Sequence, residues 1–285
     1  MPARSLLGVA VLAAVLTACG AAGKPAPVAS PPPPPLLSRA SFAQVVAATV
    51  ARDTDLGAEL VRGSEITVHA GLNWVKVDLA SAYSEYRREP ARREVIAAGA
   101  ATAAEERLSQ GFGDAGFDAV RGDLRPLLKP LFRLRREPQE PVERRLQKGL
   151  VVVYAVDRTE DFTLVTSGDL ARWGKSASEL YRIAIANLAR TTEALLCEQQ
   201  LCGWASGDGY DATRLLVPKL RREIVRRIGP AVYAVPQDEV FVALPVRLAD
   251  RIRAKVLEEF TTGKDGVSPD LFVEEHGKLV VLAGP

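Results

Sequence analysis

The segment from Trp204 to Lys219 holds the densest group of side chains in this chain that could do chemistry. Asp208, Asp211 and Arg214 lie close together, and Tyr210 falls between the two aspartates. If the charged groups faced a shared cleft, they would form a ligand-binding or catalytic loop, because loops on a rigid scaffold often carry function. A carboxylate placed there could serve a hydrolase directly or through a bound metal. The candidate functional residues are therefore Trp204, Asp208, Gly209, Tyr210, Asp211 and Arg214, together with Asn187.

The same segment also fits a purely structural turn. Gly207 and Gly209 permit positive φ angles and a close approach of the backbone. Asp208 and Asp211 could accept hydrogen bonds from nearby backbone amides, and Asp211 is placed to open a helical turn at Ala212. On this alternative, the polar side chains satisfy their own loop. A phosphate-binding Walker loop is excluded because no Gly-Lys-Ser/Thr follows, and a helix-loop-helix calcium site is excluded because its spaced acidic ligands are missing.

Histidines and cysteines offer little further chemistry. His69 and His276 are far apart in the sequence, and each is more typical of a packed or exposed structural residue. Cys197 and Cys202 are close in sequence, and in an exported protein such a pair predicts a disulfide. A redox or metal pair is the alternative, but the spacing is not Cys-x-x-Cys and no histidine is nearby. The sequence therefore predicts neither a metal ion nor a cofactor.

Residues 1–19 predict export and a lipid anchor. Arg4 supplies the positive charge of a signal peptide, and Leu6–Leu16 is an apolar run too short to span a bilayer as a helix. The four residues that end at Cys19, Leu-Thr-Ala-Cys, resemble a bacterial lipobox, in which the cysteine sulfur carries lipid. An ordinary secretory leader with a chance cysteine is the alternative. Acylation would make the membrane a stable partner, since each buried methylene adds about 0.8 kcal/mol. The expected location is the cell membrane or outer membrane, facing outside the cytoplasm.

Residues 20–38 predict a disordered tether. Seven of these nineteen residues are proline, including the run Pro31–Pro35. Such a segment favours extended polyproline II, at roughly 3.1 Å per residue, over a packed core. A ligand for SH3-type domains is the alternative, but the predicted location outside the cytoplasm disfavours it.

The rest of the chain is long enough for one large domain or two small ones. An N-terminal α+β subdomain is predicted over 39–120, from a helix at Ser41–Arg52 and a hairpin that turns at Gly63-Ser64. Residues 121–148 form a basic connector, in which four prolines prevent a long helix and nine Lys or Arg residues outnumber four acidic ones. This connector is interpreted as a solvated inter-domain segment, or alternatively as a patch for anionic lipid headgroups or cell-wall polymer.

A C-terminal α+β subdomain is predicted over 149–285, where strand hairpins alternate with helices. A capping box at Ser176–Glu179 opens a helix whose inner face carries Asn187. A buried amide needs partners, and the backbone of a neighbouring loop would supply them. A strand over 201–205 then delivers Trp204 to the candidate loop. The predicted fold class is α+β: mainly antiparallel sheet hairpins with helices packed on one face, in two subdomains.

The segment Asp208–Ala212, followed by Arg214-Leu215, resembles the signature of the YtpQ-like bacterial proteins. The resemblance includes Asn187, which precedes the loop by about twenty residues, and Ala234–Pro236 followed by an aspartate. It covers roughly Val151–Ala283, and the earlier part of the chain only loosely. That family has no assigned function, so the resemblance implies a site at the loop but no particular reaction.

Charge and composition leave two classes of function. A net charge of +2 at pH 7 argues against a dedicated nucleic-acid-binding protein. One class is a non-catalytic binding or scaffold module that recognises an unknown envelope protein or polymer. The other is a hydrolase-type enzyme that uses the Asp208/Tyr210/Asp211/Arg214 loop on an envelope substrate. Catalysis commonly recruits histidine, an activated nucleophile or clustered metal ligands, so the scarcity of these residues favours the binding module.

Overall fold

A computed structural model describes residues 35–147, 149–192, 194–204 and 206–283. The predicted signal peptide, Cys19 and most of the predicted tether lie outside the described residues. The helices and strands of this structure belong to the unit Leu36–Pro285. Within the described ranges, no helix combines the length and the apolar character that crossing a membrane requires.

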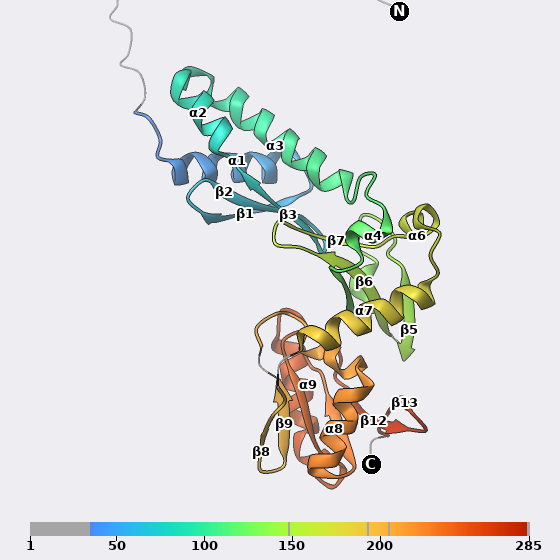
Figure 1. Ribbon diagram of the computed structural model, residues 1–285. Helices are drawn as coiled ribbons and strands as arrows, with labels where there is room; N and C mark the ends of the chain where they lie inside the picture. Colours follow the sequence, from blue (N-terminus) through green and yellow to red (C-terminus); the bar gives the residue numbers. More distant parts are fainter. Residues whose placement is uncertain (1–34, 148, 193, 205, 284–285) are drawn as a thin grey trace, which may run out of the picture. The chain divides into compact units, whose positions relative to one another are not determined.

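The fold is α+β, with helices packed against two antiparallel sheets (Figure 1), as the sequence predicts. The first sheet has the strand order β1-β2-β3-β7-β6-β4, and β5 also pairs with β6. Its strands are β1 (Gly57–Arg62), β2 (Glu65–Ala70), β3 (Asn73–Asp78), β4 (Leu124–Pro130), β5 (Glu143–Gln147), β6 (Leu150–Asp157) and β7 (Asp161–Leu164).

Three helices cover the N-terminal part of this sheet: α1 (Arg39–Asp53), α2 (Ala80–Arg88) and α3 (Arg93–Gln110), with the short 3-10 helix η1 (Pro90–Arg92) between the last two. Their apolar faces and those of β2 and β3 bury one shared core, whose members include Phe42, Val46, Ile66, Val68 and Ala97. The helix expected from Ser41 begins two residues earlier, because the side chain of Ser38 caps it by accepting a hydrogen bond from the Ser41 amide at 3.1 Å. The predicted hairpin is present, with Gly63 at a φ of 61° in its turn.

The predicted basic connector supplies two strands of the first sheet, β4 and β5, and the short helix α5 (Leu131–Leu134); the short helix α4 (Phe117–Val120) comes just before it. Two of its prolines, Pro126 and Pro130, lie in β4, which pairs along its length with β6. Backbone groups that face one edge of a strand recur at every second residue, so Leu128 shares the outer edge with both prolines. Its amide, which lies between the two prolines in that row, donates to Thr213 Oγ1 at 3.1 Å. The prolines therefore suit an edge that is closed by a side chain rather than by another strand.

The second sheet has the order β13-β12-β10-β11-β9-β8. Its strands are β8 (Leu196–Glu198), β9 (Leu201–Trp204), β10 (Ala231–Ala234), β11 (Phe241–Pro245), β12 (Leu271–Glu275) and β13 (Lys278–Val281). The helices of this half of the chain are α6 (Ser167–Trp173), α7 (Ala177–Thr191), η2 (Ala212–Leu216), α8 (Pro218–Ile228), η3 (Val246–Leu248) and α9 (Ala249–Thr262). The predicted capping box at Ser176 and Glu179 opens α7, and Pro218 occupies the first turn of α8.

One hydrophobic cluster takes members from both sheets, among them Val152 and Tyr154 of β6 and Tyr233 of β10. Polar contacts reinforce this junction, because Lys129 of β4 pairs with Asp238 and Gln147 of β5 donates to the Leu279 carbonyl at 2.5 Å. The first sheet takes strands from all three predicted segments, 39–120, 121–148 and 149–285. Strands β1–β7 form the first sheet and β8–β13 form the second, so the change from one sheet to the other falls between β7 and β8. This boundary differs from those of the predicted subdomains.

Candidate functional site

The candidate loop connects β9 to η2, as the sequence predicts for a strand-to-helix turn. Gly207 and Gly209 both have positive φ angles, 67° and 76°. A side chain at either position would strain the backbone, since L-residues other than glycine rarely adopt these angles. The two glycines let the chain fold back sharply, so that the aspartates on either side of Gly209 approach the same arginine.

That arginine is Arg214, whose side chain is fully buried. It donates through Nη1 to Asp208 Oδ1 at 2.9 Å and to Asp211 Oδ1 at 2.7 Å, and through Nη2 to Asp208 Oδ2 at 2.6 Å. The pair with Asp208 is therefore a two-pronged fork, and a third carboxylate oxygen comes from Asp211, which is fully buried as well. Arg214 Nε has no hydrogen-bond partner among the described residues.

Ser206 completes this group, and its part was not foreseen from the sequence. Its hydroxyl contacts Asp208 Oδ1 at 2.8 Å and Asp211 Oδ1 at 2.6 Å, and its amide donates to Asp211 Oδ2 at 3.1 Å. The Tyr210 amide donates to Asp208 Oδ1 at 2.9 Å. A serine two residues before an aspartate is a recurrent turn pattern, and that spacing was the available signal. We call Ser206, Asp208, Asp211 and Arg214 the ionic clamp.

The clamp changes the acidity of its exposed aspartate. Burial alone would raise the pKa of Asp208, but hydrogen bonds from Arg214, Ser206 and the Tyr210 amide overcome this and lower the pKa to about 2. The Asp208 carboxylate is thus charged in the folded protein across the ordinary pH range. Asp211 precedes η2, as expected, but it caps no amide of that helix because its carboxylate points back to Ser206 and Arg214.

The Tyr210 side chain makes a contact outside the ionic clamp. Its hydroxyl donates to Asp157 Oδ2 of β6 at 2.6 Å, which links the loop to the first sheet. Burial and the negative charge of Asp157 raise the pKa of Tyr210 far above its usual range, so the phenol stays protonated. Two residues later, the amide of Ala212 donates a hydrogen bond to the Asp238 carbonyl at 2.9 Å. The loop is thus fixed to both neighbouring parts of the structure.

The other two candidate residues are structural neighbours rather than members of the clamp. Trp204 is buried and meets the Phe241 ring edge-on, with 4.9 Å between ring centroids. Asn187 is buried on α7, as predicted, and its amide nitrogen donates to the carbonyls of Arg121 at 2.8 Å and Leu124 at 2.9 Å. The backbone that it holds is therefore the start of β4 and not the candidate loop.

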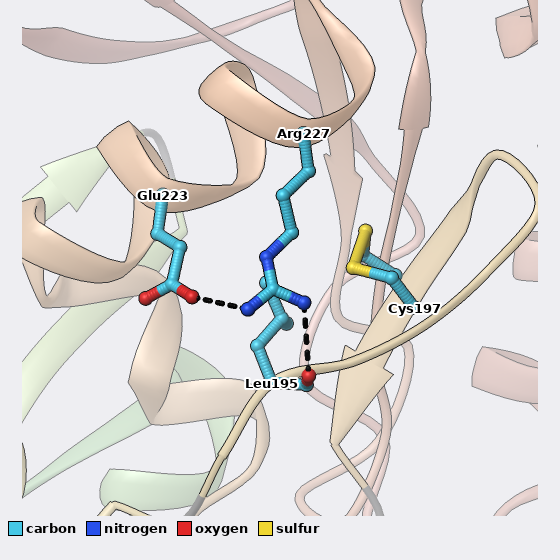
Figure 2. Close-up of a disulfide and its surroundings, with 5 residues drawn as sticks. Leu195, Cys197, Glu223 and Arg227 are labelled. Carbon is cyan, nitrogen blue, oxygen red and sulfur yellow. Dashed lines mark hydrogen bonds and ion pairs between the residues drawn. A yellow bond between two sulfur atoms is a disulfide. The ribbon is translucent and has the colours of Figure 1, made fainter.

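The predicted disulfide is present and joins Cys197 of β8 to Cys202 of β9, which lie opposite each other in the antiparallel register. Figure 2 shows Arg227 of α8 beside this bridge. Arg227 donates to Glu223 at 2.5 Å and to the Leu195 carbonyl, just before β8, at 3.5 Å. The hairpin is therefore held both covalently and by the neighbouring helix.

Two hollows in the described surface lie away from the ionic clamp. One, of about 410 Å³, lies between the end of α3 and α6 and is lined partly by Glu105, Gln110 and Arg172. A second, of about 380 Å³, lies between β5 and β13 and has a basic lining. Neither hollow includes a residue of the ionic clamp. Within the described ranges, no group of three or more His, Cys, Asp or Glu side chains is arranged to hold a metal ion.

Comparison with known proteins gives one informative relative. The chain is 26% identical over 136 residues to a UPF0354 protein of Halalkalibacterium halodurans, a match that covers 45% of this chain and 51% of that protein. The chain therefore spans about half the length of the curated relative that it matches. No family model and no solved structure matches the chain. The similarity supports kinship with a bacterial family whose function is uncharacterised.

Proposed function

We propose that this protein is a lipid-anchored, non-catalytic binding or scaffold module of the bacterial cell envelope, whose C-terminal half is YtpQ-like. The observation that carries the non-catalytic part is that the carboxylate oxygens of the ionic clamp accept hydrogen bonds from their own loop. Each of the four oxygens of the Asp208 and Asp211 carboxylates accepts a hydrogen bond from Ser206, Tyr210 or Arg214. A carboxylate that serves a substrate must present an oxygen to it, whereas these oxygens stabilise their own loop.

The surroundings of the clamp support a scaffold role. Thr213 closes the edge of β4, Tyr210 binds Asp157 of β6, and the Ala212 amide binds the Asp238 carbonyl. One short segment therefore connects the first sheet with the second. Burying a charged pair is costly unless hydrogen bonds surround it, and the clamp provides those bonds. Its buried charges fix a unique geometry at the junction of the two sheets.

The start of the folded part supports a tether before it. The Leu37 amide donates to the Tyr86 hydroxyl at 2.8 Å, and its carbonyl accepts from the Tyr83 hydroxyl at 3.0 Å. Both tyrosines belong to α2. These bonds fix the backbone just before α1, at the end of the proposed 20–38 tether. Lipidation of Cys19 would then attach the folded part to the membrane through the proline-rich segment.

The hydrolase alternative rests on Asp208, because its side chain is 38% exposed whereas that of Asp211 is fully buried. The two aspartates therefore give a test. In a structural clamp, Asp211→Asn removes the fully buried partner of Arg214 and costs about 3–5 kcal/mol. Asp208→Asn costs about 1 kcal/mol, since solvent screens part of that interaction. Thermal unfolding of both variants should rank Asp211→Asn as the more damaging change.

The matched control is Asp53→Asn, which breaks an exposed pair with Arg52 and should leave the melting temperature unchanged. A hydrolase would give the opposite pattern. Asp208→Asn and Asp211→Asn would then keep the wild-type melting temperature while abolishing the activity of the protein in cells, and the non-catalytic proposal would be abandoned.

A further inference from the structure

A basic cleft lies where the edge strands of the two sheets meet. β5 pairs only with β6 among the described strands, and β13 ends the second sheet. The Gln147 side chain joins the two edges by its bond to the Leu279 carbonyl. The cleft has a volume of about 380 Å³, within the range of small-molecule sites. Its lining contains four cationic side chains and no acidic one: Arg144, Arg145, Arg221 and Lys278.

Three of these cations have no acidic partner within the described residues. Arg221 is neutralised, because it binds Glu274 at 2.9 and 3.2 Å and the Leu215 carbonyl at 2.6 Å. Arg144, Arg145 and Lys278 form no ion pair in the part of the chain that the structure describes. Positive charge without a counter-charge in a concave surface attracts anions, since the walls of low polarity focus the field.

Arg144 is also held in position. Its guanidinium carbon lies 4.1 Å from the centroid of the Tyr181 ring, so the arginine stacks on an aromatic side chain of α7. Stacking fixes the guanidinium plane while its N–H donors remain free to bind an anion in two-pronged fashion. A positioned arginine loses less side-chain entropy on binding than a solvated one. This feature distinguishes the cleft from an ordinary charged surface.

A buried hydroxyl group lies near this cleft, on strand β6. Tyr154 is fully buried on β6, and its hydroxyl has no hydrogen-bond partner among the described residues. It is two residues from Val152, which lines the cleft, so both side chains point to the same face of the sheet. Arg144 and Tyr181 are its electrostatic neighbours, and burial raises the pKa of Tyr154 to about 12. The phenol stays protonated, but Tyr154 does not line the cleft and its hydroxyl is inaccessible, so it adds no donor to the cleft.

We propose that this cleft is an anion site that binds a phosphate ester, with Arg144, Arg145 and Lys278 contacting the phosphate oxygens. Phosphate suits the cleft better than carboxylate, because it offers more oxygens to donors that come from separate elements. The cleft is also larger than a phosphate group alone, so it has room for the organic part of an ester. This site gives the proposed binding module a ligand class, and it rests on that proposed function.

The test uses the full chain in a non-ionic detergent, titrated by calorimetry. The probes are inorganic phosphate, glycerol phosphate, acetate, and mixed micelles that contain phosphatidylglycerol or phosphatidylcholine. Saturable binding of glycerol phosphate, tighter than that of acetate and weakened by salt, is the expected result. Stronger binding to phosphatidylglycerol micelles would assign the phosphate to a lipid headgroup, and tighter binding of the soluble probes would assign it to a soluble ester. Equal affinity for acetate and glycerol phosphate would overturn the phosphate assignment.

Two variants locate the site. A triple variant, Arg144→Gln, Arg145→Gln and Lys278→Gln, should lose at least about tenfold in affinity, the size of one charged hydrogen bond. The matched control removes three exposed cations, Arg135→Gln, Arg136→Gln and Arg226→Gln, and should bind as the wild type does. Wild-type affinity in the cleft variant, or an equal loss in the control, would overturn the site.

Tyr154→Phe provides a further control, because it removes no charge and only a buried hydroxyl group that does not line the cleft. Phosphate affinity should stay at the wild-type value, and the melting temperature should stay equal or rise, since the hydroxyl has no partner to lose among the described residues. A loss of phosphate affinity would contradict this choice of donors. Absence of binding to every probe would overturn the anion site and leave the ionic clamp as it stands. Hydrolysis of glycerol phosphate would keep the site but overturn the non-catalytic function.

Discussion

Arg214 is among the largest fully buried side chains of the described residues, and it carries a charge. Residue types alone could not show that this arginine belongs to a buried ion pair and not to a catalytic loop. Two aspartates and an arginine at this spacing are typical of an active site and equally typical of a buried ion pair, as Asp208, Asp211 and Arg214 show. What separates the two is the direction of the side chains, which depends on the burial of η2 beneath both sheets. No pattern within the segment itself records that burial.

The acidity of Asp208 yields a pH prediction. Its pKa is about 2 in the folded protein, below the value of about 4 for an unfolded aspartate. A lowered folded pKa contributes stability that is fully present above the unfolded pKa and is lost as the pH falls through the folded pKa. The free energy of unfolding should therefore differ between the wild type and Asp208→Asn at pH 6, and the difference should shrink between pH 4 and pH 2.

Urea unfolding of both proteins across pH 2–6 measures that difference. A second aspartate variant, Asp55→Asn, serves as the control, because Asp55 lies on the surface and makes no ion pair among the described residues. A gap between wild type and Asp208→Asn that stays constant from pH 6 to pH 2 would contradict the linkage.

Local signals predicted several single residues well. The capping box at Ser176, Pro218 at the start of α8 and the positive φ angles of Gly207 and Gly209 each depend on neighbours within a few positions. Asn187 shows where such reasoning stops. Its burial followed from helical periodicity, but its partners, the Arg121 and Leu124 carbonyls, lie 66 and 63 residues away. No local pattern identifies partners so distant.

Among the elements, β4 is the most unusual, because a strand with two prolines was expected to be a connector. The prolines of this segment were expected to prevent a long helix, and prolines also cannot donate to a strand ladder. The pairing of β4 with β6 is tolerated because Pro126 and Pro130 face the outer edge, where Thr213 satisfies the intervening amide of Leu128. The predicted hairpins, by contrast, were found because their strands are adjacent in sequence.

Thr213 therefore offers a test of how the β4 edge is stabilised. Thr213→Val keeps the shape of the side chain but leaves the buried Leu128 amide without its acceptor. This should cost about 1–3 kcal/mol of unfolding free energy, measured by urea denaturation. Thr261→Val, an exposed threonine on α9, is the matched control and should change little. Equal stabilities of the two variants would show that the edge does not need this bond.

The β8–β9 hairpin gives a second prediction at this scale. Closing a small loop with a disulfide stabilises a fold by about 2 kcal/mol in the chain-entropy view. A reducing agent should therefore lower the urea midpoint of the wild type, but not that of a Cys197→Ala/Cys202→Ala variant. An identical midpoint with and without the reductant in the wild type would exclude a stabilising role for the bridge.

At the scale of the whole molecule, the proposed anchor is the most direct feature to test. Replacing Cys19 by alanine should move the protein from the membrane fraction to the soluble one, because the lipidated sulfur would be gone. Partition between Triton X-114 and water measures the change. The Cys197→Ala/Cys202→Ala variant is the control, because it removes the other two cysteines and should stay in the detergent phase. Continued pelleting of Cys19→Ala with membranes would rule out this anchor.

The division of the chain into sheets could not be predicted from composition. The basic segment 121–148 differs in composition from its surroundings, which suggested a boundary, but it contributes β4 and β5 to the first sheet. The pairing of β3 with β7 joins residues such as Trp74 and Phe162 across a long stretch of chain. Such pairings follow from the complete core, whereas the α+β class followed from local patterns alone.

The core beneath α1, α2 and α3 has a consequence for the order of assembly. All of its members fall between Leu37 and Leu108, so this part can collapse early, through contacts that close quickly. The edge of β3 then stays unpaired until β7 is made, because β7 comes much later in the chain. In that interval an unsatisfied strand edge would be open to pairing with another chain. We therefore expect formation of the β6–β7 hairpin to limit how quickly the newly made protein is protected from aggregation.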